Sequence, residues 1–210
     1  MVLLFLQSPT MNKIYIHILF IAITGTVISC SPKNISTRYY FQNEKVLDSI
    51  EESYKTISSK NPFSIGFTSR DFNTVSVSIL TDTLRYIYEF TVGESRLADT
   101  LTNYHLPAKP VIDLIGQMQS IRCTWINSYD YYIDEKKHSL IFMSIKPVAL
   151  KRPFKNAKYY ILTYFQQPQY FDSQGQLLER RKLRRLRKIN GEIFKRINDK
   201  VCYTVSVKFR

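Results

Sequence analysis

Residues 74–92 read TVSVSILTDTLRYIYEFTV and give the clearest structural signal in the chain. Apolar and polar side chains alternate on both sides of the short link Thr81–Thr83, and a period of two is typical of β-strands with one buried face. A link of this length joins two strands in antiparallel order. The stretch therefore predicts a β-hairpin formed by Thr74–Leu80 and Leu84–Val92.

The remainder of the chain adds strands and two helices to this hairpin. Further strands are predicted over residues 121–133, 139–145, 158–165 and 201–209. Asn43–Lys60 carries apolar residues at helical spacing, and a second helix is expected to open at Pro110, a residue favoured in the first turn. Residues 93–108 are interpreted as a polar loop.

This succession of elements predicts an α+β fold. Strands joined by tight turns form antiparallel sheets, and separate helices can cover one face of such a sheet. We expect a single domain over residues 43–210, in which the sheet is packed by two or three helices. A cystatin-like or an NTF2-like arrangement fits this content, and the sequence leaves the order of the strands open.

The first 29 residues differ from this domain in composition. Lys13 is their only charged residue, and it precedes an apolar run over residues 14–28. One cation before a short apolar run is the layout of a secretory signal peptide, whereas a helix that spans a bilayer needs about 20 apolar residues. We therefore interpret residues 1–29 as a signal peptide, and Met11 is an alternative start.

The end of this run resembles the lipobox of bacterial lipoproteins, in the form found in the Bacteroidota. Val27 stands at the aliphatic position, Ser29 at the small position and Cys30 at the modified position, while Ile28 is larger than the residue usual there. The resemblance implies that Cys30 carries acyl chains, which anchor a protein durably. It implies a protein of the outer membrane that faces the periplasm, with residues 30–42 as lipidated terminus and tether. An ordinary signal or membrane helix that contains a cysteine is the alternative.

The chain is strongly basic, with a net charge of +13. Cations dominate one segment: Arg180, Arg181, Lys182, Arg184, Arg185, Arg187 and Lys188. For an exported protein, this predicts contact with anionic lipid or an acidic envelope polymer rather than with nucleic acid. The alternative is a solvated basic face that only aids solubility.

Sequence motifs for catalysis are absent. The chain contains no G-x-S-x-G, no H-E-x-x-H, no glycine-rich phosphate loop and no zinc-type spacing of Cys and His. No catalytic residue, cofactor or metal is therefore predicted, and we expect a non-enzymatic binding or structural module with an unidentified protein partner. An envelope enzyme with a site assembled from His105, Asp130 and Glu135 is one alternative, and an immunity-type lipoprotein that blocks a toxin is another.

Two further features concern modification. Strand parity places Cys123 on an apolar face and Cys202 on a polar face, which disfavours a disulfide and predicts one buried and one partly exposed thiol. Asp82-Thr83-Leu84 and Asp99-Thr100-Leu101 resemble the acceptor pattern for O-glycosylation in the Bacteroidota. Thr83 and Thr100 are the candidates, because they fall in a predicted turn and a predicted loop.

Overall fold

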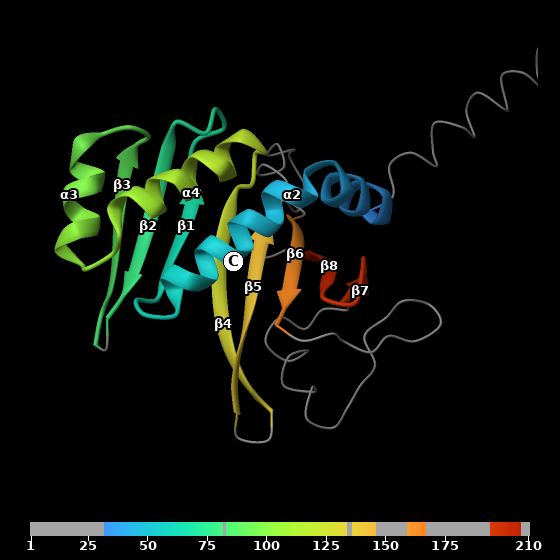
Figure 1. The fold of residues 1–210 in the computed structure, drawn as a ribbon. Helices are drawn as coiled ribbons and strands as arrows, with labels where there is room; N and C mark the ends of the chain where they lie inside the picture. Colours follow the sequence, from blue (N-terminus) through green and yellow to red (C-terminus); the bar gives the residue numbers. More distant parts are fainter. Residues whose placement is uncertain (1–31, 82, 134–135, 146–158, 167–193, 207–210) are drawn as a thin grey trace, which may run out of the picture. The chain divides into compact units, whose positions relative to one another are not determined.

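The computed structural model describes residues 32–81, 83–133, 136–145, 159–166 and 194–206 (Figure 1). The chain divides into two compact units, Met1–Ile35 and Ser36–Arg210. The second unit contains one antiparallel sheet with helices, so the predicted α+β fold is confirmed.

Within the described ranges, the sheet has eight strands in the order β3-β2-β1-β4-β5-β6-β8-β7. All neighbouring pairs are antiparallel. The strands are β1 Phe63–Phe67, β2 Thr74–Leu80, β3 Arg85–Thr91, β4 Trp125–Ile133, β5 Lys136–Ser144, β6 Tyr159–Phe165, β7 Lys195–Arg196 and β8 Val201–Ser206. The hairpin of β2 and β3 is the one that the sequence predicted, with Val75 opposite Phe90.

Three helices are described: α2 Pro32–Ser58, α3 Ser95–Asn103 and α4 Ala108–Ser120. Helices α2 and α4 lie across the same face of the sheet, which we call the inner face (Figure 1). Pro62 follows α2 closely, and a proline disfavours helical backbone in the residue before it. Gly93 has a φ of 86°, a backbone conformation that glycine adopts without strain, and it turns the chain from β3 into α3.

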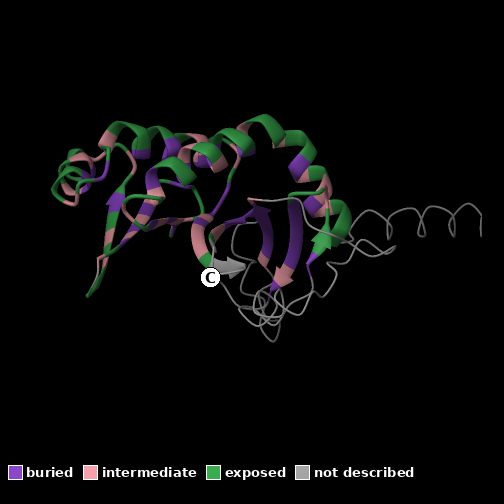
Figure 2. Cartoon of the chain, turned by 60° about the horizontal axis from the view of Figure 1, so that its bottom comes forward, coloured by how far each residue is buried: buried purple, intermediate pink, exposed green. Residues whose placement is uncertain are grey.

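The main core lies between the helices and the inner face. Helix α2 buries Leu47, Ile50 and Tyr54, and α4 buries the stripe that contains Leu114 and Met118. Figure 2 shows both helices exposed outside and buried toward the sheet. Apolar side chains at these spacings stabilise a helix by packing rather than by intrinsic propensity.

A second core lies on the opposite face, which we call the outer face. Its buried residues are Leu140, Phe142, Ile161, Phe165, Phe194 and Cys202. The outer face of β3 is open instead, and Ile87 there is 67% exposed. The sheet is therefore buried on both faces at β5, β6 and β8, and on one face at β3.

Several predicted boundaries are wrong. The predicted tether over residues 30–42 is helical in its described part, because α2 begins at Pro32, and it buries Ser36 and Tyr40. The predicted loop over residues 93–108 contains α3, which buries Leu97 and Leu101 at helical spacing. Residues 121–124, predicted as strand, connect α4 to β4.

The two cysteines of the domain are free, and both are buried. The prediction that Cys202 is partly exposed is wrong, because its face of β8 belongs to the outer core. Cys123 precedes β4, and its thiol lies 3.6 Å from the carbonyl oxygen of Trp125. Burial raises the pKa of the Cys123 thiol to about 12, and it also raises the pKa of the Cys202 thiol.

Candidate functional site

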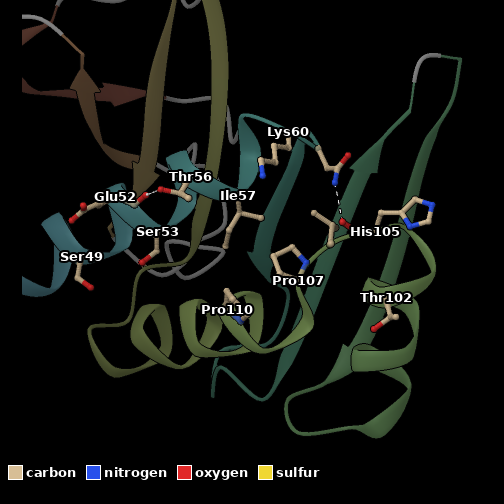
Figure 3. Close-up of a pocket in the computed structure, with 12 residues that line it drawn as sticks. Ser49, Glu52, Ser53, Thr56, Ile57, Lys60, Thr102, His105, Pro107 and Pro110 are labelled. Carbon is tan, nitrogen blue, oxygen red and sulfur yellow. Dashed lines mark hydrogen bonds between the residues drawn. The ribbon is translucent and has the colours of Figure 1, made fainter.

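A groove with a volume of about 890 Å³ lies between the second half of α2 and the segment that joins α3 to α4 (Figure 3). We call it the helix groove. Its lining residues are Ser49, Glu52, Ser53, Thr56, Ile57, Lys60, Asn61, Thr102, His105, Leu106, Pro107 and Pro110. Its volume is within the range of ligand pockets in proteins, roughly 300 to 1,000 Å³.

The middle of the helix groove is apolar. Ile57 on α2 faces Pro107 and Pro110 at the start of α4, as Figure 3 shows. Ile57 and Leu106 are buried, whereas both prolines are exposed. Proline has no backbone N–H and a fixed φ, so these residues present rigid apolar surface to the groove.

Polar side chains along α2 form one rim. Ser49, Ser53 and Thr56 are spaced by four and three residues, which places them on one side of the helix. The hydroxyl of Thr56 donates a hydrogen bond of 2.9 Å to the carbonyl oxygen of Glu52. Glu52 and Lys60 add one charge of each sign. A ligand of this groove would need an apolar body with hydrogen-bonding groups along one side.

The opposite wall is held by backbone contacts. The side-chain amide of Asn61 donates a hydrogen bond of 2.9 Å to the carbonyl oxygen of His105. The amide of Leu106 donates to the carbonyl oxygen of Leu101 at 2.9 Å, which closes the end of α3. His105 has a φ of 57°, and its imidazole points away from Ile57 and Pro107 (Figure 3). His105 therefore contributes backbone rather than imidazole to the groove.

No protein-family model, curated protein or solved structure matches this chain.

The helix groove presents hydroxyl groups along one rim and an apolar centre. Its serine and threonine hydroxyls could act as nucleophiles only with a base within hydrogen-bond reach, and the hydroxyl of Thr56 instead donates to the carbonyl oxygen of Glu52. Within the described part of the chain, no group of three or more His, Cys, Asp or Glu side chains could hold a metal ion. Likewise, none of the described helices is both long and apolar enough to cross a membrane.

Two residues of the alternative enzyme site, His105 and Asp130, do not share this groove. Asp130 lies on β4, where its carboxylate pairs with Lys137 at 2.9 Å, and it does not line the groove that contains His105. Glu135 lies outside the described residues. Of the two acids in this set, only Asp130 is described, and it does not line the groove with His105.

The remaining predicted site residues are those for lipidation, for contact with an anionic surface and for O-glycosylation. Cys30 and the basic segment Arg180–Lys188 lie outside the described residues. Thr83 is exposed in the turn between β2 and β3. Thr100 is half-buried inside α3, so its prediction as a loop residue is wrong.

Sequence reasoning missed the helix groove. Its residues come from α2 and from a segment about fifty positions further on, and neither carries a catalytic motif. The sequence signal nearest to it was Pro110, since proline is favoured in the first turn of a helix and therefore marked the start of α4, which borders the groove.

Proposed function

We propose that this protein is a lipid-anchored, non-enzymatic component of a bacterial cell envelope, at the outer membrane and facing the periplasm. The observation that carries the anchor is the sequence Val27-Ile28-Ser29-Cys30, directly after an apolar run. Acyl chains on Cys30 would contribute about 0.8 kcal/mol for each buried CH₂ group, which suffices for lasting attachment when several chains are present.

We further propose that the domain binds a ligand in the helix groove. The groove supports this because its centre is apolar while its α2 rim carries Ser49, Ser53 and Thr56. Such a mixture suits a neutral or zwitterionic amphipathic molecule, because the groove offers one charge of each sign, Glu52 and Lys60. Contact of the Arg180–Lys188 segment with anionic lipid is a second part of the proposal.

The anchor is tested by intact-mass analysis of the protein extracted from membranes. We expect the wild-type chain to lack residues 1–29 and to carry acyl mass on Cys30. Cys30→Ala should carry none, while the neighbouring Ser31→Ala should be acylated as in the wild type. A wild-type protein that retains residues 11–29 would overturn the proposal of a lipoprotein.

The ligand site is tested by photo-crosslinking in cells. A photoreactive amino acid at Ser53 points into the helix groove, whereas one at Thr83 stands in an exposed turn far along the chain. We expect a discrete product from position 53 only. Equal labelling from both positions would show that contact there is unspecific.

A further inference from the structure

A second hollow, of about 600 Å³, lies between residues 40–55 of α2 and the segments around β6 and β8. We call it the acidic groove. Its lining residues are Tyr40, Glu44, Asp48, Glu51, Lys55, Tyr164, Phe165, Gln166, Asn198, Asp199, Lys200 and Val201. None of them lines the helix groove, so the two sites are separate.

The net charge of this groove is negative, whereas the net charge of the whole chain is positive. The lining has four carboxylates and two ammonium groups, whereas the whole chain has 30 basic and 17 acidic residues. Asp199 already pairs with Arg196. The carboxylates of Glu44, Asp48 and Glu51 take part in none of the salt bridges of the described chain. Within the described residues, none of these three acidic side chains forms an ion pair, although Lys55 and Lys200 line the same hollow.

The surroundings of these carboxylates favour a cation. Burial raises the pKa of Asp48, and the charge of Glu44 raises it further. Burial also raises the pKa of Glu51, and Asp48 and Glu52 add to the rise, whereas Lys55 and Lys200 act in the opposite direction. A raised pKa means that the fold stabilises the ionised carboxylates less than water does. A bound cation would supply the missing interaction.

An unpartnered phenol lies beside these acids. Tyr164 is only 6% exposed, and its hydroxyl is buried without a hydrogen-bond partner among the described residues. Burial raises its pKa, and the neighbouring ionisable groups of Tyr40, Asp48, Cys123 and Glu51 raise it further, so the hydroxyl lies within electrostatic reach of these acids. An unmade hydrogen bond of a buried polar group costs roughly 1 to 3 kcal/mol, which a ligand donor would recover.

One wall of the groove is fixed by a chain of hydrogen bonds. The side-chain amide of Asn198 donates to the hydroxyl of Tyr40 at 3.0 Å, and this hydroxyl donates to Glu44 at 3.1 Å. The side-chain oxygen of Asn198 in turn accepts from the amides of Lys200 and Val201. The aromatic ring of Tyr40 is therefore held in place at the groove.

The spacing of the acids selects the kind of cation. Glu44, Asp48 and Glu51 are separated by four and three residues, so they lie along one side of α2 over about 10 Å. They do not converge, and no metal-binding group of three such side chains is present in the described residues. Several protonated amines along a flexible chain match this row better than a single ion does.

We propose that the acidic groove binds a linear polyamine-type cation. Its ammonium groups pair with Asp48 and Glu51, and one N–H donates to the phenolic oxygen of Tyr164. Spaced amines occur both in free polyamines and in lysine side chains of an extended peptide, and the experiment includes both.

Isothermal titration of the full-length protein in a nonionic detergent tests this site. The probes are spermidine, a peptide with alternating lysines, butylamine as a single amine, and MgCl₂. We expect spermidine or the peptide to bind with one-to-one stoichiometry, and whichever binds more tightly identifies the source of the amines. Butylamine and Mg²⁺ should bind at least about tenfold more weakly, since each lost ion pair or charged hydrogen bond is worth about 1.4 kcal/mol or more.

Variants locate the binding. The double variant Asp48→Asn/Glu51→Gln should weaken spermidine at least about tenfold, and Tyr164→Phe should weaken it several-fold. Asp113→Asn removes one exposed carboxylate on α4 and should leave the affinity unchanged. Unchanged affinity in the double variant, or Mg²⁺ binding as tight as that of spermidine, would overturn the proposal. Thermal unfolding of each variant confirms that it is folded.

Discussion

The phenol of Tyr39 donates a hydrogen bond of 2.8 Å to the carbonyl oxygen of Ile121, which lies 82 positions further along the chain. Ile121 caps the end of α4, where helix carbonyls have no partner within the helix. Tyr39 belongs to the part of α2 that the sequence assigned to a tether. This contact therefore fixes that part of α2 to the end of α4, on the inner side of the sheet.

Tyr39→Phe should lower the free energy of unfolding by about 1 to 2 kcal/mol, because it leaves the Ile121 carbonyl without its partner. Urea denaturation followed by circular dichroism measures the loss. Tyr86→Phe is the matched control: Tyr86 stacks on Tyr88 with ring centroids 6.4 Å apart, and no hydrogen bond of its hydroxyl is described. Equal losses in both variants would mean that the Tyr39 hydrogen bond contributes nothing.

Strands of this fold could be predicted from the sequence where only one face of the sheet is buried. Alternation identified β2 and β3 because only one face of each strand packs against helices. It misjudged Cys202, because the polar-looking face of β8 packs into a second core with Phe194. A one-sided sheet was assumed, and burial on both faces depends on distant segments that a local pattern does not contain.

Prediction of the helices and grooves was limited in the same way, because local sequence patterns do not contain contacts with distant segments. Leu97 and Leu101 were the only apolar signal for α3, too little for a helix of nine residues to be predicted. Neither groove was predictable, because each joins α2 to segments far along the chain. Acid spacing along α2 was visible, but the buried hydroxyl of Tyr164 beside it follows only from the packing of β6.

Phe194→Ala should destabilise the fold by about 3 to 5 kcal/mol, because Phe194 is fully buried and contacts Phe165 at a ring distance of 6.0 Å. Ile87→Ala, on the exposed outer face of β3, should cost less than about 0.5 kcal/mol. Thermal or urea unfolding compares the two. Similar small effects would show that the outer face at β6 and β8 has no packed core.

Cys123 and Cys202 should resist alkylation in the folded protein. Both thiols are buried, and burial raises the pKa of Cys123 to about 12, so little reactive thiolate exists near pH 8. Iodoacetamide treatment with peptide mass mapping should label both positions only after denaturant is added. Rapid labelling of either native thiol, or a disulfide-linked peptide pair, would contradict the structure.

The basic segment should contribute salt-sensitive membrane binding. Replacing Arg180, Arg181, Arg184 and Arg185 by glutamine removes four cations, each worth about 1 kcal/mol near an anionic surface. Cosedimentation of a Cys30→Ser form with phosphatidylglycerol vesicles should show strong loss of binding, whereas phosphatidylcholine vesicles should bind neither form. Unchanged binding to anionic vesicles would remove the segment from the proposed function.

The acidic groove should also leave a signature in the pH dependence of stability. Burial raises the pKa of Glu51 in the folded protein above its ordinary value of 4.5. At a pH between the ordinary pKa and the raised pKa, the folded state therefore binds more protons than the unfolded state. The free energy of unfolding then falls as pH rises through the folded pKa, and Glu51→Gln removes this fall. The stability of the Glu51→Gln variant relative to the wild type should therefore increase as pH rises above about 4.5.

Asp71 should contribute a pH dependence of stability that is opposite in sign to that of Glu51. A hydrogen bond from Ser69 and then one from the amide of Asn73 lower its pKa below the ordinary value of 3.8. This carboxylate stabilises the fold above pH 3.8 and loses that effect as pH falls through its folded pKa, so Asp71→Asn should lose stability relative to the wild type as pH rises. Urea denaturation of both variants from about pH 3 to about pH 7 compares the slopes. Slopes of the same sign would show that Glu51 is not desolvated in the groove.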